Sequence, residues 1–184
     1  VEFFDGTTSL GTVALAAGEA SIETSSLALG SHSLTAVYSG DTLNTPATSS
    51  AATVTVLTVA GVAVAASTET PLVGDPVTLT ATVTGNAPSG TVEFFDGVTS
   101  LGVVAVSGGT AAVVVPSFVA GDHSITAIYS GDAGNTTATS TVLTVNSSKT
   151  TATIALAASD ETPFVDDPVT LTATVTGNAP SGTV

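Results

Sequence analysis

The feature that most constrains this chain is an internal repeat of about ninety residues. The run VEFFDGTTSLG that starts at Val1 returns as VEFFDGVTSLG at Val92, an offset of 91 residues. The 24 residues of 69–92 return almost unchanged at 161–184, an offset of 92. A period of this length indicates copies of one domain-sized unit in tandem, rather than one large core.

The repeat predicts where the domains begin and end. Residues 1–59 are expected to form the C-terminal part of one repeat, with its later strands, and residues 60–146 a complete domain. Residues 147–184 are expected to form the first strands of the next repeat, continuing into the equivalent of residue 1. The boundaries fall near 59–61 and 146–149, and linkers this short predict closely coupled neighbours. The residues expected at junctions between repeats are Val1, Val59, Ala60, Asn146, Lys149 and Val184.

Two assemblies would make such a chain part of a polymer. In the first, one giant chain runs through many repeats. In the second, separate chains associate head to tail, and 147–184 of one chain donates the first strands missing from 1–59 of the next. The chain starts without methionine and inside an expected strand. A window of a continuous chain is therefore the favoured expectation.

The residue pattern within each repeat is typical of β-strands. In 76–84, PVTLTATVT, apolar residues alternate with threonine, so one face of the strand is expected to be buried. The same alternation recurs at 169–176. Asp96-Gly97 is expected to turn a hairpin, since these residues adopt positive φ at low cost. The other strands expected in the middle repeat are 62–66, 92–95, 100–106, 111–115, 123–129 and 141–145.

These patterns predict an all-β fold class, namely tandem immunoglobulin-like β-sandwiches of about seven strands each with no helix of consequence. Val and Thr pack well in strands, whereas the helix formers Glu, Lys, Gln and Arg are scarce. The chain has no Cys and no Trp, so it lacks the disulfide and the tryptophan of antibody domains. Successive Phe94 and Phe95 must point to opposite faces of a strand, so only one ring can enter the core.

The charge of the chain excludes several classes of function. Lys149 is the only basic side chain against fifteen acids, which gives a formal net charge of −14. Contacts to phosphate need Lys and Arg, so nucleic acid and anionic membrane surfaces are not expected partners. The longest apolar run, 57–66, is short of the ~20 residues of a membrane span. Membrane insertion is therefore not expected.

The stretch 90–145 resembles a known family. It contains a G-x-V-x-F-x-D-G strand and turn, an L-G on the return strand, an A-G-x-H-x-[LI]-T-A-x-Y-x-G-D segment and a closing T-V strand. In this order the motifs resemble the bacterial Ig-like repeat domain of group 3. The resemblance implies tandem arrays in large secreted or surface-attached bacterial proteins, where they serve as stalks, spacers and adhesive modules. It implies an extracellular or cell-surface location and no active site.

The histidines and tyrosines recur at the period of the domain. His32 and His123 are 91 residues apart, as are Tyr38 and Tyr129. A structural role is expected for each histidine, because no surrounding pattern indicates a triad or a zinc site. The tyrosines are expected to bury their rings and to hydrogen-bond the backbone. No catalytic residue is predicted, and the chain is not expected to be an enzyme.

Carboxylates offer the only ligand chemistry that the pattern supports. Four acids gather at the start of the third repeat and a fifth closes a YSGD turn; they are Asp160, Glu161, Asp166, Asp167 and Asp132. Ca²⁺ takes six to eight oxygen ligands, so such oxygens could stiffen a joint between domains. However, the middle repeat has fewer acids at the corresponding positions, and no D-x-D-x-D-G loop occurs. No cofactor is therefore expected, and Ca²⁺ is the alternative.

The sequence offers two kinds of residue for covalent modification, asparagine sequons and a single lysine. Asn135 and Asn146 each begin an N-x-[ST] sequon, a match that is usually coincidental in a bacterial protein. Lys149 could join a Lys–Asn cross-link of the kind found in surface pili. One lysine in two repeats argues against such a bond in every domain.

The function expected from these observations is structural. The chain would be a component of an extracellular fibre, stalk or spacer, and its partners would be copies of itself or adjacent repeats, head to tail. The alternative is a cell-surface adhesin module that binds glycan or protein. A third interpretation, an accessory domain of a secreted enzyme, stays open.

Overall fold

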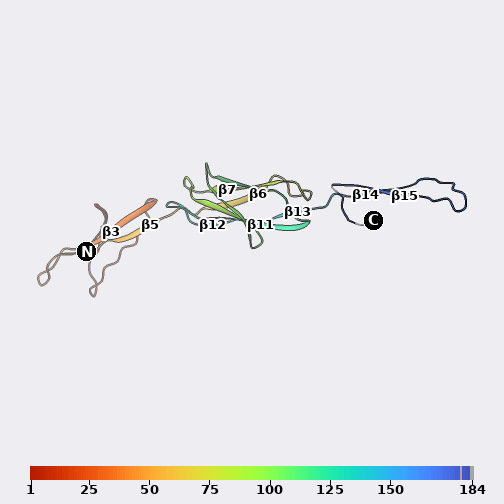
Figure 1. Cartoon of the computed structure of the whole chain (residues 1–184). Coiled ribbons are helices and arrows are strands. Elements are labelled where there is room, and N and C mark those ends of the chain that lie inside the picture. Colours follow the sequence, from red (N-terminus) through yellow and green to blue (C-terminus); the bar gives the residue numbers. More distant parts are fainter. Residues whose placement is uncertain (179, 183–184) are drawn as a thin grey trace.

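The computed structural model describes residues 1–178 and 180–182. Its regular secondary structure is all β-strand, with no helix within these ranges. The strands form three groups that follow one another in an elongated row (Figure 1). Across the described residues, no helix is long and apolar enough to cross a membrane.

The first group is a single antiparallel sheet. Its order is β2-β1-β3-β4, and β5 also pairs with β3. No second sheet covers it within the described residues. The strands are β1 (Glu2–Asp5), β2 (Thr8–Thr12), β3 (Gly30–Tyr38), β4 (Ala47–Thr48) and β5 (Ala52–Val56).

The middle group is a two-layered sandwich. One sheet has the order β10-β7-β6, and the other has the order β12-β11-β8-β9 with β13 also paired to β11. The expected all-β, immunoglobulin-like β-sandwich is therefore confirmed. Its strands are β6 (Gly61–Ala66), β7 (Val77–Thr84), β8 (Thr91–Asp96), β9 (Thr99–Ala105), β10 (Thr110–Val115), β11 (Gly121–Tyr129), β12 (Ala138–Thr139) and β13 (Leu143–Ser147).

The seven strands expected in this repeat are all present, with bounds that lie within two residues of those expected. β12 was not expected, because its two residues are too few to show a period. The last strand was expected at 141–145 but spans Leu143–Ser147, since β13 continues pairing with Gly121 and Asp122 of β11.

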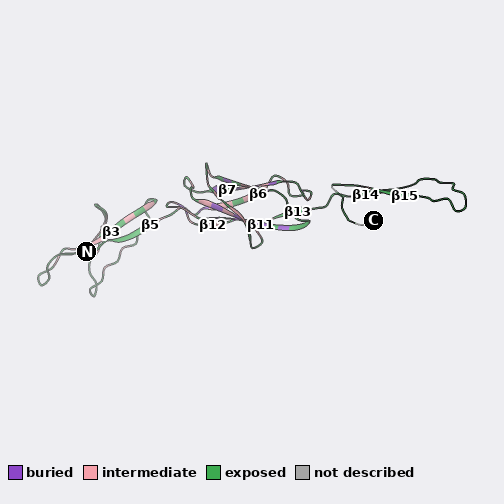
Figure 2. Ribbon diagram, in the orientation of Figure 1, coloured by how far each residue is buried: buried purple, intermediate pink, exposed green. Residues whose placement is uncertain are grey.

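The core lies between the two sheets of the middle group, as the purple segments of Figure 2 show. Along β7 the apolar residues are buried while the threonines between them are not. Phe94 enters the core and Phe95 stays on the outer side. The fully buried apolar side chains are Val77, Leu79, Ala81, Val92, Phe94, Ile125, Ala127, Tyr129 and Val145.

The third group is a hairpin of β14 (Thr153–Ala158) and β15 (Leu171–Thr176). It corresponds to β6 and β7, and its register is the same: Thr153 faces Thr176 as Gly61 faces Thr84. Its side chains are almost all exposed, in contrast to those of β7.

Candidate inter-domain junction

The linker between the first two groups is bound by its backbone to the domain that follows. The Thr58 N–H donates to the Gly134 carbonyl at 2.9 Å, and the Thr136 N–H donates to the Thr58 carbonyl at 3.0 Å. The Ala60 N–H donates to Thr136 Oγ1 at 3.1 Å. The linker therefore forms a short parallel pairing with the turn after β11.

Asn135 holds that turn against the loop between β7 and β8. Its side chain is buried, with 2% exposed. Its Oδ1 accepts from the Asn86 N–H at 2.7 Å, and its Nδ2 donates to the Asn86 carbonyl at 2.9 Å. Nδ2 also donates to Asp132 Oδ1 at 2.8 Å. Because its amide is buried and paired on both atoms, Asn135 is not an accessible acceptor for a glycan in the folded domain.

Asp132 is the second anchor of this turn. Its carboxylate accepts from the Ser89 N–H at 2.7 Å, from the Gly134 N–H at 2.8 Å and from the Tyr129 hydroxyl at 2.8 Å. These donors, the Ser89 N–H first, hold the pKa of Asp132 well below its usual range. Burial, and then the bond to Asp132, raises the pKa of Tyr129 to about 12.

The first repeat contains the same turn, but within the described residues it has no counterpart of the β7–β8 loop that contacts the turn in the middle domain. Tyr38 donates to Asp41 at 2.5 Å, and the Asn44 side chain donates to the same carboxylate at 2.9 Å. The Tyr38 hydroxyl, first among the donors, lowers the pKa of Asp41 well below its usual range. The tyrosine hydroxyls were expected to bond to the backbone; in both repeats the hydroxyl donates instead to an aspartate three residues later, which the turn brings back to the ring.

The second junction uses different residues. The Asn146 N–H donates to the Glu69 carbonyl at 2.8 Å, and the Ser148 N–H donates to the Pro71 carbonyl at 3.1 Å. The Val73 N–H in turn donates to the Ser148 carbonyl at 2.9 Å. The chain that leaves β13 is therefore tied to the loop between β6 and β7 by parallel pairing before it enters the third group.

The residues expected at the junctions take different positions. Ala60 is buried and its N–H donates to Thr136 in the turn after β11. Val59 and Lys149 are exposed. The Asn146 side chain donates to Asp122. Val1 directly precedes β1, an internal strand of the first sheet, and its amino group donates to the Val13 carbonyl at 2.8 Å. Val184 lies outside the described residues, so its expected place beside an equivalent of Val1 stays a prediction.

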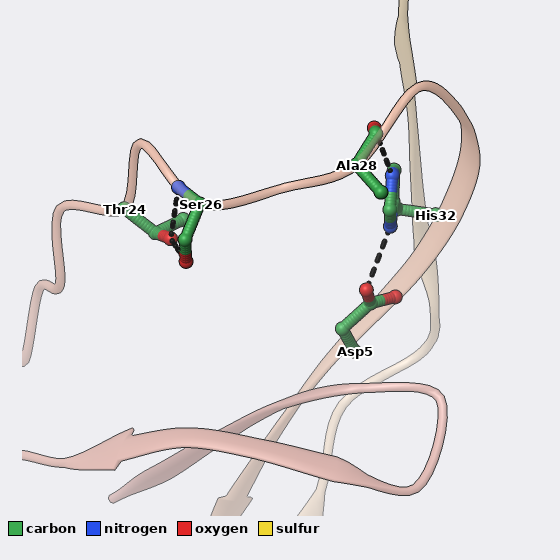
Figure 3. A network of polar contacts seen from close by, with 5 residues as sticks. All are labelled: Asp5, Thr24, Ser26, Ala28 and His32. Carbon is green, nitrogen blue, oxygen red and sulfur yellow. Dashed lines mark hydrogen bonds and ion pairs between the residues drawn. The ribbon is translucent and has the colours of Figure 1, made fainter.

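Each histidine clamps a hairpin turn to the loop that precedes the next long strand. His123 Nδ1 lies 2.5 Å from Asp96 Oδ2, and Nε2 lies 2.9 Å from the Val119 carbonyl oxygen. His32 makes the same pair with Asp5 at 2.6 Å and Ala28 at 2.8 Å (Figure 3). Both partners are acceptors, so both contacts are hydrogen bonds when each ring nitrogen carries a proton, which is the imidazolium form.

The acids considered for calcium do not all come together. Asp132 lies at the end of the middle domain that faces the first group, whereas the four acids of 160–167 lie in the loop between β14 and β15. Within that loop, Asp160 accepts from the Thr162 N–H and Asp167 from the Phe164 N–H. Across the described part of the chain, no three His, Asp or Glu side chains are grouped as metal ligands. Asp132 and the acids of 160–167 therefore lie apart within one copy of the chain, and calcium at these residues stays an untested expectation.

The sequence patterns do not identify Asp96 as the partner of His123 or Asn135 as the residue that holds the turn after β11. Asp96 was treated only as a turn residue and Asn135 only as a sequon. A signal was present, because Asp5 and Asp96, like Asn44 and Asn135, are 91 residues apart and so recur together with the histidines and tyrosines.

The chain was compared with known proteins. A search of curated proteins found no match. Seven chains of solved structures match; one belongs to the fibronectin(III)-like modules of CbhA from Clostridium thermocellum, with 20% sequence identity, coverage of 47% of this chain and 94% of that chain, and a TM-score of 0.41. A family model described as bacterial Ig-like domain (group 3) matches residues 1–57 and again 64–148. The chain therefore belongs to the family of bacterial Ig-like domains of group 3.

Proposed function

We propose that this chain is a structural component of an extracellular stalk, fibre or spacer built from tandem Ig-like domains. The observation that carries the proposal is the linker at Thr58, whose N–H and carbonyl both bond to the turn of the following domain. Thr58 lies two residues after the end of β5 and is held by both of these bonds to the following domain, so little free chain separates the two groups. No catalytic role is part of the proposal, since Ig-like families are generally non-catalytic.

Two features support a role as a rod. The joint at Thr58 is formed mostly by backbone atoms, and Asn135 and Thr136 of its turn have counterparts in Asn44 and Thr45, so a joint of this kind can be built in other repeats. The net charge of −14 also keeps neighbouring rods apart, because like charges repel over about a Debye length.

Electron spin resonance can test the rigidity of the joint. The chain has no native cysteine, so spin labels can be placed selectively at Leu29→Cys and Val103→Cys, which are exposed positions just before β3 of the first group and on β9 of the middle domain. A narrow distribution of distances between the labels is expected. Thr58→Pro removes the N–H that bonds Gly134 and should broaden the distribution markedly.

Val59→Pro is the matched control. Val59 is exposed and lies next to Thr58, but both backbone bonds of Thr58 remain possible in this variant. The distribution should stay narrow. A broad distribution in the unmodified linker would show that the domains move independently, and the spacer would then be a flexible tether rather than a rod.

A further inference from the structure

The two joints of the middle domain lie beside different ionisable side chains. The first joint is the pairing of Thr58 with the turn after β11, and the second is the pairing of Ser148 with the β6–β7 loop. His123 and Tyr129 lie six residues apart on β11, which is about 20 Å along a strand. His123 faces Val145 on β13, close to where the chain leaves for the second joint, whereas Tyr129 lies at the first.

Tyr129 and Asp132 at the first joint keep their charge near neutral pH. Burial raises the pKa of Tyr129 to about 12. The Ser89 N–H, first among several donors, holds the pKa of Asp132 well below its usual range. The second joint differs, because the ordinary pKa of imidazole is about 6.5 and small shifts move it across neutral pH.

His123 holds the loop between β10 and β11. Its Nε2 lies 2.9 Å from the Val119 carbonyl oxygen, and its ring lies against the Phe118 ring, with 4.5 Å between the ring centroids. Its Nδ1 contacts Asp96 at the end of β8. Loss of one proton leaves a neutral ring with a single N–H. Because a carboxylate is the stronger acceptor, that N–H stays toward Asp96, and the Val119 carbonyl then faces a lone pair.

The same loop is bonded to the loop that forms the second joint. Ser117 Oγ, two residues before Val119, accepts from the Gly74 N–H at 2.9 Å. Next to Gly74, the Val73 N–H donates to the Ser148 carbonyl at 2.9 Å. One continuous series of contacts therefore connects the imidazole to the chain that leaves β13.

The β6–β7 loop also lies beside the third group. A β-carbon built on Gly74 would lie 3.9 Å from Asn178 Nδ2, in the loop after β15. Val73, Lys149, Thr150 and Asn178 together line an open pocket of about 280 Å³. A shift of the β6–β7 loop would therefore reach the third group both through the linker and through this contact.

We propose that the second joint is pH-sensitive: it is held tightly while His123 is imidazolium and loosens once the ring loses a proton. The change reaches the joint through Ser117 and Gly74. The first joint has a different set of contacts and stays tight over the same range of pH. The inference rests on the proposed array, in which the second joint connects successive domains, and it adds a form of regulation to that joint.

The charges around His123 set the direction of the response. The charged side chains on the elements that surround it are those of Asp96 on β8, Asp122 on β11, Glu69 and Asp75 in the β6–β7 loop and Lys149 in the linker. Burial lowers the pKa of His123, but the Val119 carbonyl, Asp96 and Asp122 outweigh it, so the pKa is raised. The joint is therefore fully tight below about pH 6.5 and loosens as pH rises through the folded value.

Amide hydrogen exchange compares the two joints within one molecule. Between pH 6 and pH 9, the protection factors of the Val73 and Ser148 N–H groups should fall about five-fold, the effect of about one lost hydrogen bond. The Thr58 and Thr136 N–H groups of the first joint are the internal control and should keep their protection. Constant protection at the second joint would overturn the inference. An equal fall at both joints would also overturn it, because the whole domain would then be loosening.

Three variants locate the response. His123→Gln cannot titrate, so the pH dependence at the second joint should disappear. Ser117→Ala keeps the histidine contacts but removes the acceptor of the Gly74 N–H, so the joint should stop responding while the thermal stability of the domain still depends on pH. His32→Gln, in the equivalent clamp of the first repeat, is the matched control and should leave the response unchanged. A response that survives Ser117→Ala would overturn the path, and one that His32→Gln removes would overturn the assignment to His123.

Spin labels measure the motion of the second joint itself. Val103→Cys and Ile154→Cys are exposed positions on β9 and β14. The distribution of distances between them should be narrow at pH 6 and broader at pH 9, whereas the pair across the first joint should stay narrow at both. An unchanged width across the second joint would overturn this inference and leave the rod proposal standing. A broad distribution across the first joint at both pH values would overturn the rod proposal alone.

Discussion

The first sheet and the larger sheet of the middle domain have the same register and different burial. Glu2 faces Val37 as Glu93 faces Ile128, and Gly30 faces Val56 as Gly121 faces Ser147. Both sheets contain the histidine clamp and the tyrosine–aspartate turn. Within the part of the chain that the structure describes, a second sheet covers the middle sheet and not the first. The comparison shows that the local contacts follow from the residues of each repeat. The burial of the core depends in addition on the strands that precede the sheet in the chain, which are β6 and β7 in the middle domain.

The largest expected difference between the two sheets concerns their inward phenylalanines. Phe94→Ala removes a fully buried ring and should lower the free energy of unfolding of the middle domain by about 3–5 kcal/mol. Phe3→Ala, at the equivalent half-buried position, should cost about 1 kcal/mol, since less apolar area is lost. Urea unfolding, monitored separately in each sheet by amide hydrogen exchange, measures the loss of stability in both variants. Equal losses would mean that the first sheet is covered in solution.

A smaller difference is expected at the asparagines of the turns. Asn135→Ala removes three hydrogen bonds of a buried side chain, among them the acceptor of the Asn86 N–H, and should cost about 2 kcal/mol. Asn44→Ala removes only exposed bonds to Asp41 and should cost about 0.5 kcal/mol. The same unfolding experiment applies. A small loss for Asn135→Ala would show that the loop of 85–90 is not held by this side chain.

The smallest expected effect is a dependence of stability on pH. Burial alone would lower the pKa of His123, but the Val119 carbonyl and the Asp96 carboxylate outweigh it, so the pKa is raised. A raised pKa in the folded state means that the stabilisation is fully present below the ordinary value of about 6.5 and is lost as pH rises through the folded value. Thermal unfolding between pH 6 and pH 9 should show this decline.

His123→Gln separates the clamp from other titrations. The glutamine cannot titrate, so the decline of stability with rising pH should become shallower in this variant. His32→Gln is the companion variant in the first repeat, where the Ala28 carbonyl and then Asp5 raise the pKa of the histidine. An unchanged slope in both variants would show that the clamps do not hold imidazolium.

Much of the fold was predictable because it depends on local patterns. The alternation of apolar residues with threonine placed β7 and β15, and the Asp-Gly pair placed the turn in which Gly97 adopts φ of +58°. The roles of Asn135 and Asp96 were not predicted, because their partners are distant in sequence: Asn86 is 49 residues away and His123 is 27. Such contacts depend on which loops meet at one end of a sandwich, which periodicity does not encode.

The parallel pairing at the two ends of the middle domain has a mechanical consequence. Tension along the row would enter the domain at Ala60 and leave it beyond Ser148, while Pro71 and Val73 are bonded to the backbone of Ser148. The segment around Leu72 and the segment around Ser148 run parallel and would be pulled in opposite directions along their length. The hydrogen bonds between these two segments would therefore be loaded together in shear. A hairpin pulled from its open end would instead peel apart one bond at a time.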